Sequence, residues 1–471
     1  MERMEGVDAG YLYMETPTMH MHTVKVSILE RPGEFDIDQF GEEVLARLDR
    51  LPPFGRRVVQ VPFRLNHPMW VSDRPLDIRR HVIHQALPSP GGMKELEELV
   101  GQIISQPLDR SIPLWELHLV EGLAGDRVAV VAKLHHALAD GNAANNLLGN
   151  VTGARGPDGP TRPLEPTPTR FALVAAALRD ATVQLFTVPA LVRRTVANVV
   201  ALVKIRRGSD VSPPRPLLDV PRTSFNGALG MRRNFATCTL SLDEIKAVRV
   251  AHGVTVNDVV LGVAGGALRR WMDERGERPS ASLTAGVPVG TEPPGSPPRL
   301  SGNRVSTLFT TLATDIDDPH ERLAEIHRVT DAAKLVHRTL GPDMLIDWVQ
   351  FTPPAPFAAG MRLYSRARAA SWHPAPFNVV VSNVAGPREE VFLGDSRLVD
   401  LFSVGPILEG IGLNITVWSY QDRVNVTVIS CPDLVPDLGP LIAQFGPALQ
   451  DLRKSDAMTE ASASIDGGTS S

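Results

Sequence analysis

The chain has 471 residues, of which 43% are hydrophobic and 21% charged, and its formal net charge is -5. This length exceeds the size at which a single hydrophobic core keeps growing, so two major domains are expected. The small negative charge argues against a nucleic-acid partner, which requires a basic face. The two cysteines, Cys238 and Cys431, lie far apart and lack the spacing of a zinc site. We therefore expect a reduced, cytoplasmic setting and no bound metal.

The first half of the chain alternates segments typical of strands and helices. Hydrophobic patterning predicts strands over 22–29 and 127–134 and helices over 37–48 and 93–105, with another helix beginning near Asn145. The N-terminus shows no basic region followed by an apolar core, so no secretory signal is expected. Strands alternating with helices indicate an α/β sandwich.

A segment rich in Gly, Pro and Thr over 153–170 predicts a linker, and a helix follows over 171–207 with a kink at Pro189. Its charged residues interrupt the apolar stretch, so we do not expect it to span a bilayer. One hypothesis is peripheral contact with anionic lipid, on the inner membrane face or a lipid droplet. The alternative is a connecting helix packed against the two domains. The basic residues behind the first hypothesis are Arg193, Arg194, Lys204, Arg206 and Arg207.

The second half again alternates element types after a proline-rich loop. The predicted elements are a strand over 232–240, helices over 241–252 and 257–274, a strand over 377–382 and a hairpin of 412–419 with 423–430. The tail from 456 has no apolar period and is expected to be disordered. The sequence therefore predicts an N-terminal domain over 1–150, a linker with a connecting helix over 151–230, a C-terminal domain over 231–455 and a tail over 456–471.

The most informative stretch, 133–141, reads Lys-Leu-His-His-Ala-Leu-Ala-Asp-Gly and follows an apolar strand. A histidine at a strand end can face a cleft from a rigid backbone, where it can accept and return a proton near neutral pH. Taken singly, His136 could be a structural residue and Asp140 a helix N-cap. His136, Asp140 and Gly141 together form His-X-X-X-Asp-Gly.

This pattern resembles the signature of the CoA-dependent acyltransferase superfamily, and the preceding His135 narrows the resemblance to bacterial wax ester synthase/diacylglycerol acyltransferases. Three further motifs occur in the family's order: Pro-Leu-Trp-Glu with Trp115, Asn-Asp-Val-Val-Leu over 257–261, and Ser-Asn-Val-Ala-Gly-Pro over 382–387. The alanine of the last motif departs from the usual Val-Pro-Gly-Pro ending.

The resemblance implies two chloramphenicol-acetyltransferase-like α/β sandwich domains with the active site in a tunnel between them. It implies transfer of a long-chain acyl group from acyl-CoA to diacylglycerol, with acyl-CoA as co-substrate and no cofactor. His136 would be the proton acceptor, and Asp140 would hold the loop, often through an arginine. Because strand residues alternate in direction, His135 should face the opposite side in a packing role.

Two further motif residues are candidates for binding the thioester. Asn257 and Ser382, which precedes Asn383, are candidates for polarising the thioester carbonyl. An N-cap role for Asn257 is the alternative.

Other functions remain open at this point. Wax ester synthesis from long-chain alcohols and a non-catalytic lipid-surface scaffold on the same fold are alternatives to triacylglycerol synthesis. His135 and Asp140 also satisfy the His-X-X-X-X-Asp pattern of glycerol-phosphate acyltransferases, but the phosphate-binding segment of that family is missing. Gly-X-Ser-X-Gly, expected of a serine hydrolase, does not occur. Direct transfer without an acyl-enzyme is therefore predicted.

Overall fold

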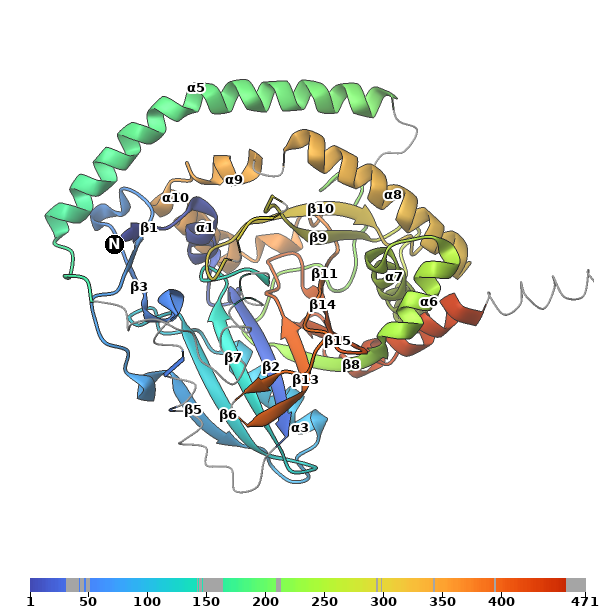
Figure 1. The fold of residues 1–471 in the computed structure, drawn as a ribbon. Coiled ribbons are helices and arrows are strands. Elements are labelled where there is room, and N and C mark those ends of the chain that lie inside the picture. The colour runs from blue at the N-terminus through green and yellow to red at the C-terminus, as the bar shows by residue number, and fades with distance from the viewer. Residues whose placement is uncertain are drawn as a thin grey trace, which may run out of the picture.

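The computed structural model describes residues 1–30, 51–141 and 164–454, apart from 209–212, 294, 298, 342–343 and 394 (Figure 1). It also describes Glu42, Ala46, Arg47, Ala143 and Asn146. Two six-stranded sheets carry the fold, and a three-stranded sheet lies at the N-terminal edge. Helices cover the large sheets, as the alternating sequence pattern predicts.

The first large sheet has the order β12-β13-β2-β7-β6-β5, with only β5 and β6 parallel. Its strands are β12 (Phe392–Leu393), β13 (Ser396–Val404), β2 (His22–Glu30), β7 (Arg127–His135), β6 (Trp115–Leu123) and β5 (Val82–Ala86). Helix α3 (Met93–Ser105) covers one face, where Val100 and Ile104 pack in one core with Val24 and Val26.

The second large sheet has the order β10-β9-β11-β14-β15-β8. Its strands are β10 (Val305–Thr311), β9 (Thr284–Gly290), β11 (Val379–Val384), β14 (Leu413–Tyr420), β15 (Arg423–Ser430) and β8 (Asn234–Ser241). Helices α6 (Leu242–His252), α7 (Val256–Glu274), α8 (Pro319–Leu340) and α11 (Gly439–Ile442) accompany it. Leu261 and Leu268 of α7 are fully buried against Val381 and Ile415, which makes this the larger of the cores.

The N-terminal helix α1 (Gly6–Met14) packs against α9 (Met344–Val349) and α10 (Pro354–Arg366), from the other half of the chain. A Cβ at Gly6 would lie 2.4 Å from the Cα of Gln350, so the close approach of the two segments requires glycine there. The short elements nearby are β1 (Glu2–Arg3), β3 (Arg57–Val59), β4 (Met69–Val71), η1 (Pro52–Gly55), η2 (Pro62–Arg64), η3 (Ile78–Arg80) and η4 (Ala369–Ser371).

Helix α5 (Arg170–Gly208) is the predicted connecting helix and contains Pro189. Figure 1 shows it bending over the molecule above α9 and α8. By length and composition, residues 170–204 are apolar enough to cross a membrane. The charges alone therefore do not exclude a span, because the apolar residues outweigh them in an 18-residue window. The expectation that this helix does not cross a bilayer stays a prediction.

Most predicted elements are confirmed to within one or two residues, including the helices over 93–105 and 241–252 and the hairpin of 412–419 with 423–430. The helix over 37–48, the helix start near Asn145 and the tail from 456 lie largely or wholly outside the described residues. The division at 231 does not follow the sheets. Strands β12 and β13 fall within 231–455, yet β13 pairs with β2 of the first sheet.

Candidate active site

His136 lies directly after β7, where its backbone N–H donates to the carbonyl of Met21 at 2.7 Å. Its ring stacks on Tyr11 of α1, with 4.3 Å between the ring centroids. The side chain is partly exposed, and its Nε2 has no hydrogen-bonding partner among the described residues. The strand and α1 together fix the imidazole while one nitrogen remains free.

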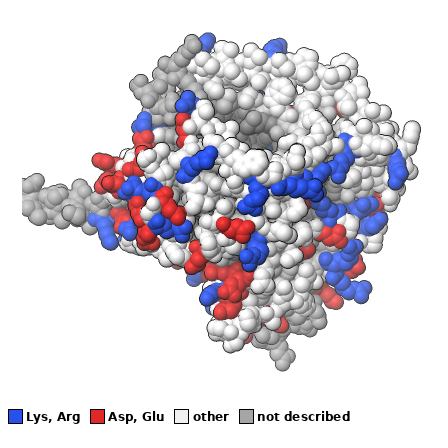
Figure 2. Space-filling model, turned by 180° about the vertical axis from the view of Figure 1, so that it is seen from behind, with Lys and Arg blue, Asp and Glu red and all other residues white. Residues whose placement is uncertain are grey.

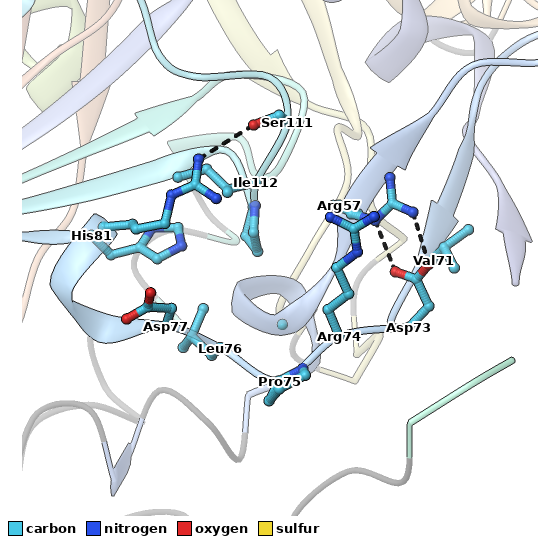
Figure 3. Close-up of a pocket in the computed structure, with 13 residues that line it drawn as sticks. Arg57, Val71, Asp73, Arg74, Pro75, Leu76, Asp77, His81, Ser111 and Ile112 are labelled. Carbon is cyan, nitrogen blue, oxygen red and sulfur yellow. Dashed lines mark hydrogen bonds and ion pairs between the residues drawn. The ribbon is translucent and has the colours of Figure 1, made fainter. Parts of the chain in front are cut away.

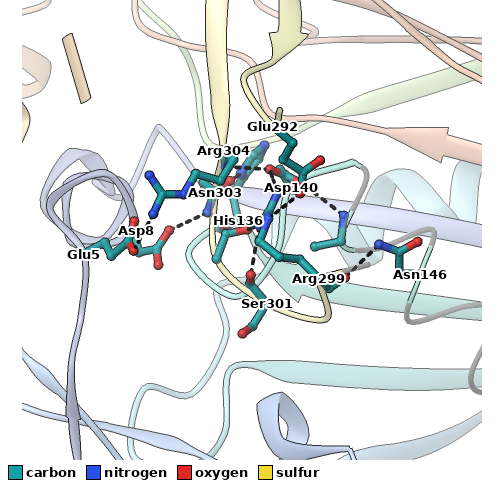
Figure 4. A network of polar contacts seen from close by, with 12 residues as sticks. Glu5, Asp8, His136, Asp140, Asn146, Glu292, Arg299, Ser301, Asn303 and Arg304 are labelled. Atoms are coloured by element: carbon teal, nitrogen blue, oxygen red, sulfur yellow. Dashed lines mark hydrogen bonds and ion pairs between the residues drawn. The ribbon is translucent and has the colours of Figure 1, made fainter. Parts of the chain in front are cut away.

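The other nitrogen of His136 contacts Asn303 from the second half of the chain (Figure 4). His136 Nδ1 lies 3.0 Å from Asn303 Oδ1. Asn303 Nδ2 donates to the carbonyl of His136 and to Asp8 Oδ1, each at 2.8 Å. Because a carbonyl only accepts, Nδ2 must face it, and Oδ1 must then face the imidazole. Nδ1 therefore carries the proton, and the lone pair of Nε2 points away as a free base.

Burial sets the protonation of His136. It lowers the pKa of the imidazole, while the charge of Asp140, a hydrogen bond with the backbone of His136 itself and the hydrogen bond with Asn303 partly offset this effect. A histidine with a lowered pKa is neutral at pH 7, which is the state that accepts a proton.

Asp140 joins the histidine loop to the segment 299–304. Its Oδ2 accepts from Arg299 Nη2 at 2.7 Å and from the backbone N–H of Arg304 at 2.8 Å. Its Oδ1 accepts from the backbone N–H of Ala143 at 2.9 Å, an N-cap geometry. A β-bridge between Ala139 and Gly302 adds to the join. The predicted arginine partner is thus Arg299, and the capping and loop-holding contacts coexist.

The end of β11 meets the same loop. A Cβ at Gly141 would lie 3.4 Å from Cγ2 of Val384, which places Asn383 one residue and Ser382 two residues from this contact. Val381 faces the core beneath α7, so strand alternation places Ser382 on the face of Val384 and Asn383 on the core side.

His135 enters different surroundings from His136. It is fully buried, its Nδ1 accepts from the backbone N–H of Ala137 at 3.0 Å, and its Nε2 lies 3.6 Å from the carboxylate of Glu15. The other carboxylate oxygen of Glu15 lies 3.6 Å from Nε2 of His22. These contacts are the packing and hydrogen-bonding surroundings that strand alternation predicts.

Trp115 does not reach His136. It is buried, its Nε1 donates to the carbonyl of Phe54 at 2.9 Å, and its ring stacks on His81 at 4.1 Å. A small pocket beside this motif is lined by arginines and aspartates (Figure 3). Arg57 binds Asp73 there through two hydrogen bonds of 2.8 and 2.7 Å. The Trp115 hydrogen bond joins β6 to η1, and the Arg57–Asp73 pair joins β3 to the residues after β4. Neither contact brings a catalytic group to the pocket.

Asn257 is not an N-cap, because α7 begins one residue earlier. Thr255 caps the helix, and it forms a reciprocal capping box with Asp258. Asp258 also lies 2.8 Å from Nδ1 of His327 on α8. No contact among the described residues connects Asn257 with His136.

The sequence did not indicate Asp8, Tyr11 or Asn303 as site residues. Asp8 is only 4% exposed, in a helix otherwise made of apolar and small residues, and that isolated buried carboxylate is the one available signal. Beside it lies a cavity of about 120 Å³, lined by Arg3, Arg56, Arg299, Arg304 and Asp8 among others. Within the described part of the chain, no group of three or more His, Cys, Asp or Glu residues could hold a metal ion.

Comparison with known proteins gives matches along most of the chain. Residues 4–260 match the wax ester synthase/diacylglycerol acyltransferase catalytic domain, and residues 301–453 match the C-terminal domain of the same family. A Mycobacterium tuberculosis protein provisionally named as a diacylglycerol O-acyltransferase is 40% identical over 93% of this chain and 92% of its own length. The chain belongs to this family.

Solved structures agree. The wax ester synthase/diacylglycerol acyltransferase from Marinobacter aquaeolei VT8 has a TM-score of 0.68 and 26% identity, covering 97% of this chain and 99% of that one. The first condensation domain of the calcium-dependent antibiotic synthetase shares the fold, with a TM-score of 0.58, 14% identity and 94% coverage of both chains. The predicted α/β fold and the prediction of an acyltransferase are confirmed.

Proposed function

We propose that this acyltransferase moves a long-chain acyl group from acyl-CoA to the free hydroxyl of diacylglycerol. The observation that carries the proposal is the free Nε2 of His136, whose tautomer is fixed by Asn303. The name of the 40% identical relative supports the acceptor. Nε2 takes the hydroxyl proton as the oxygen attacks the thioester carbonyl. The tetrahedral intermediate then expels the CoA thiolate, and the thiolate takes the proton from Nε2, giving triacylglycerol and CoA.

We propose Ser382 as a donor to the developing oxyanion, because its strand end reaches the histidine loop at Gly141. Asn257 has no such contact with the loop. Ser382→Ala should lower kcat about tenfold or more while leaving KM for acyl-CoA within a factor of about two. An unchanged kcat would remove Ser382 from the mechanism.

The transfer is direct in this proposal. Neither cysteine suits an acyl-enzyme: burial raises the pKa of Cys238 to about 12, and buried Cys431 accepts a hydrogen bond from the backbone N–H of Gly230. Initial rates over a grid of both substrates should give intersecting lines, the pattern of a ternary complex. An acyl adduct that forms with acyl-CoA alone and proceeds to product, detected by intact-protein mass spectrometry, would contradict direct transfer.

The acceptor is tested by side-by-side turnover of palmitoyl-CoA with dioleoylglycerol and with hexadecanol, measured as released thiol and as lipid product. The proposal expects the higher kcat/KM with dioleoylglycerol. Wax ester synthesis is the second candidate, because the Marinobacter structure carries both activities in its name. Turnover of neither acceptor would favour a lipid-surface scaffold.

We also propose that the protein works at a lipid surface that α5 contacts lengthwise. Many of its apolar side chains are exposed, among them Phe186 at 79%. Neighbouring Phe63 of η2 is 90% exposed with φ at 58°, a strained conformation for an aromatic residue. Figure 2 shows few charged side chains along the upper part of the molecule, where α5 lies in Figure 1. A surface of this kind suits the interfacial region of a lipid layer.

Contacts along α5 favour a helix that lies on the surface over one that spans a membrane. Asp180 pairs with Arg3 at 2.5 Å, Thr195 accepts from Trp348 Nε1 at 2.9 Å, and Asn198 donates to the carbonyl of Leu340 at 2.7 Å. Arg194, one of the cations predicted to face lipid, is already paired with Asp347. Arg193 and Lys204 are exposed, and the side chains of Arg206 and Arg207 lie outside the described residues.

Vesicle flotation tests this contact. Phe63→Ser with Phe186→Ser should reduce binding to phosphatidylglycerol/phosphatidylcholine vesicles several-fold while sparing turnover of hexanol, which needs no lipid surface. Val250→Ser is the matched control, because Val250 is 72% exposed on α6. A wild-type protein that does not bind vesicles would make α5 a connecting helix only.

A further inference from the structure

We infer that Asp8 is a positioning residue for acyl transfer: through Asn303, it selects the tautomer of His136 that leaves Nε2 unprotonated. The inference rests on the proposed role of His136 as the base and deepens it. Three segments far apart in the sequence meet here, since 167 residues separate His136 from Asn303 and 295 separate Asn303 from Asp8.

The carboxylate is placed by the packing of α1. Gly6 lies against Gln350, whose Oε1 accepts from the backbone N–H of Gly6 at 2.5 Å. Asp8 and Tyr11 are three residues apart and therefore share one face of the helix. Tyr11 covers the ring of His136 while Asp8 binds the amide beyond it. One short helix thus contacts both the base and the group that orients the base.

Asp8 matters because an amide has two nearly equal ends. Asn303 could otherwise turn and present Nδ2 to Nδ1 of His136, which would leave the proton on Nε2. The carbonyl of His136 occupies one hydrogen of Nδ2, and Asp8 occupies the other. With both hydrogens bound to acceptors, the amide has one satisfied orientation.

During the reaction the hydroxyl proton moves only between the substrate and Nε2 of His136. Nε2 gains the hydroxyl proton, Nδ1 keeps its own, and Asn303 Oδ1 accepts a stronger hydrogen bond from the imidazolium. The neutral amide separates the carboxylate from the ring, so no proton reaches Asp8. Burial raises the pKa of Asp8 to about 7, and the hydrogen bond from Asn303 partly offsets this effect. The other charged or titratable groups around it among the described residues are Glu2, Glu5, Tyr11, Arg3, Arg56, His136, Asp140, Arg299 and Arg304.

The test uses the full chain and a set of graded variants. Asp8→Ala removes the acceptor and should lower kcat about 10- to 100-fold with little change in KM. Asp8→Asn keeps an oxygen that can accept from Asn303 and should lose less than about tenfold. Glu5→Gln is the matched control. It also removes a carboxylate at the start of α1, but this carboxylate pairs with Arg304, 3.1 Å away. Its kcat should stay within a factor of about two.

Exchanging the side chains of Asp8 and Asn303 distinguishes a positioning role from general support of the fold. Asn303→Asp should lower kcat at least about 100-fold, because it removes the donor to the carbonyl of His136 and places two carboxyl groups together. Adding Asp8→Asn restores a donor opposite an acceptor, and the double variant should recover at least about tenfold of the lost kcat. A purely structural role would make the two changes additive.

A second readout does not depend on turnover. Diethyl pyrocarbonate acylates an unprotonated imidazole nitrogen, and fragment mass spectra distinguish His136 from buried His135. At pH 8.5 the rate at His136 should fall about tenfold in Asp8→Ala and recover in the exchanged pair. The inference is overturned if both kcat and this rate are unchanged in Asp8→Ala, or if the exchanged pair shows no recovery. If the labelling rate at His136 falls in Asp8→Ala but the wild-type protein shows no acyltransferase turnover, the proposed function alone is overturned.

Discussion

The two histidines at the end of β7 enter two polar clusters that differ in what lies between histidine and carboxylate. In the first cluster, Glu15 lies directly beside His135 and His22, with nitrogen-to-oxygen distances of 3.6 Å. In the second, the neutral amide of Asn303 separates Asp8 from His136. Burial lowers the pKa of His135, His22 and His136 alike, so what differs is the free nitrogen. Glu15 lies directly beside Nε2 of His135, whereas the amide of Asn303 contacts Nδ1 of His136 and leaves its Nε2 free.

The largest expected difference is in activity. His136→Ala should lower kcat/KM at least about 1,000-fold in a folded protein, because the attacking hydroxyl loses its base. His135→Ala should keep appreciable kcat and lose stability, because it leaves Glu15 buried with one partner fewer. Both are measured by acyl-CoA turnover and by urea unfolding. Near-wild-type turnover in folded His136→Ala would end the proposed mechanism.

The sequence predicts one cluster member well and its partners poorly. His136 lies at the end of a strand whose apolar run is local, so its position follows from neighbouring residues. Asp8 and Asn303 reach it only because α1 packs on α9 and because the segment 299–304 bridges to the histidine loop. Such contacts depend on tertiary topology, which hydrophobic periodicity does not encode. Strand β13 shows the same limit, since its local pattern does not say that it joins the first sheet.

A smaller effect on activity and stability is expected at Asp140, which joins the histidine loop to the segment 299–304. Asp140→Ala should lower the free energy of unfolding by about 2–3 kcal/mol, because Arg299 and two backbone N–H groups lose their acceptor. Activity should fall with it as the loop loosens. Asp140→Asn keeps the capping oxygen and should lose less of both. A loss of rate with an unchanged unfolding free energy would instead give Asp140 a direct part in the chemistry.

The response of stability to acid is smaller over the window from pH 7.0 to 5.5, at about 1.4 kcal/mol or less per histidine, and here the clusters should act in opposite directions. Burial lowers the pKa of His22 to about 4, and that of His20, whose ring stacks on His22, to about the same value. Between about pH 6.5 and 4 the unfolded chain therefore binds their protons and the native protein does not. Each histidine then removes about 1.4 kcal/mol of stability per pH unit as pH falls through this window. The raised pKa of Asp8, about 7, means that the native protein binds its proton first, so Asp8 adds stability as pH falls from about 7 to 4.

Urea unfolding at pH 7.0 and 5.5 separates these contributions. Replacing His22 with Gln should reduce the loss of stability between the two pH values, and Asp8→Asn should increase it. The comparison uses the change with pH within each variant, so a general destabilisation by the substitution cancels. Equal pH slopes in wild type and both variants would show that neither cluster changes its proton binding on folding. A slope that is unchanged in Asp8→Asn alone would mean that Asp8 stays ionised down to pH 5.5 in the native protein, because its carboxylate is stabilised by Asn303 as much as burial opposes it.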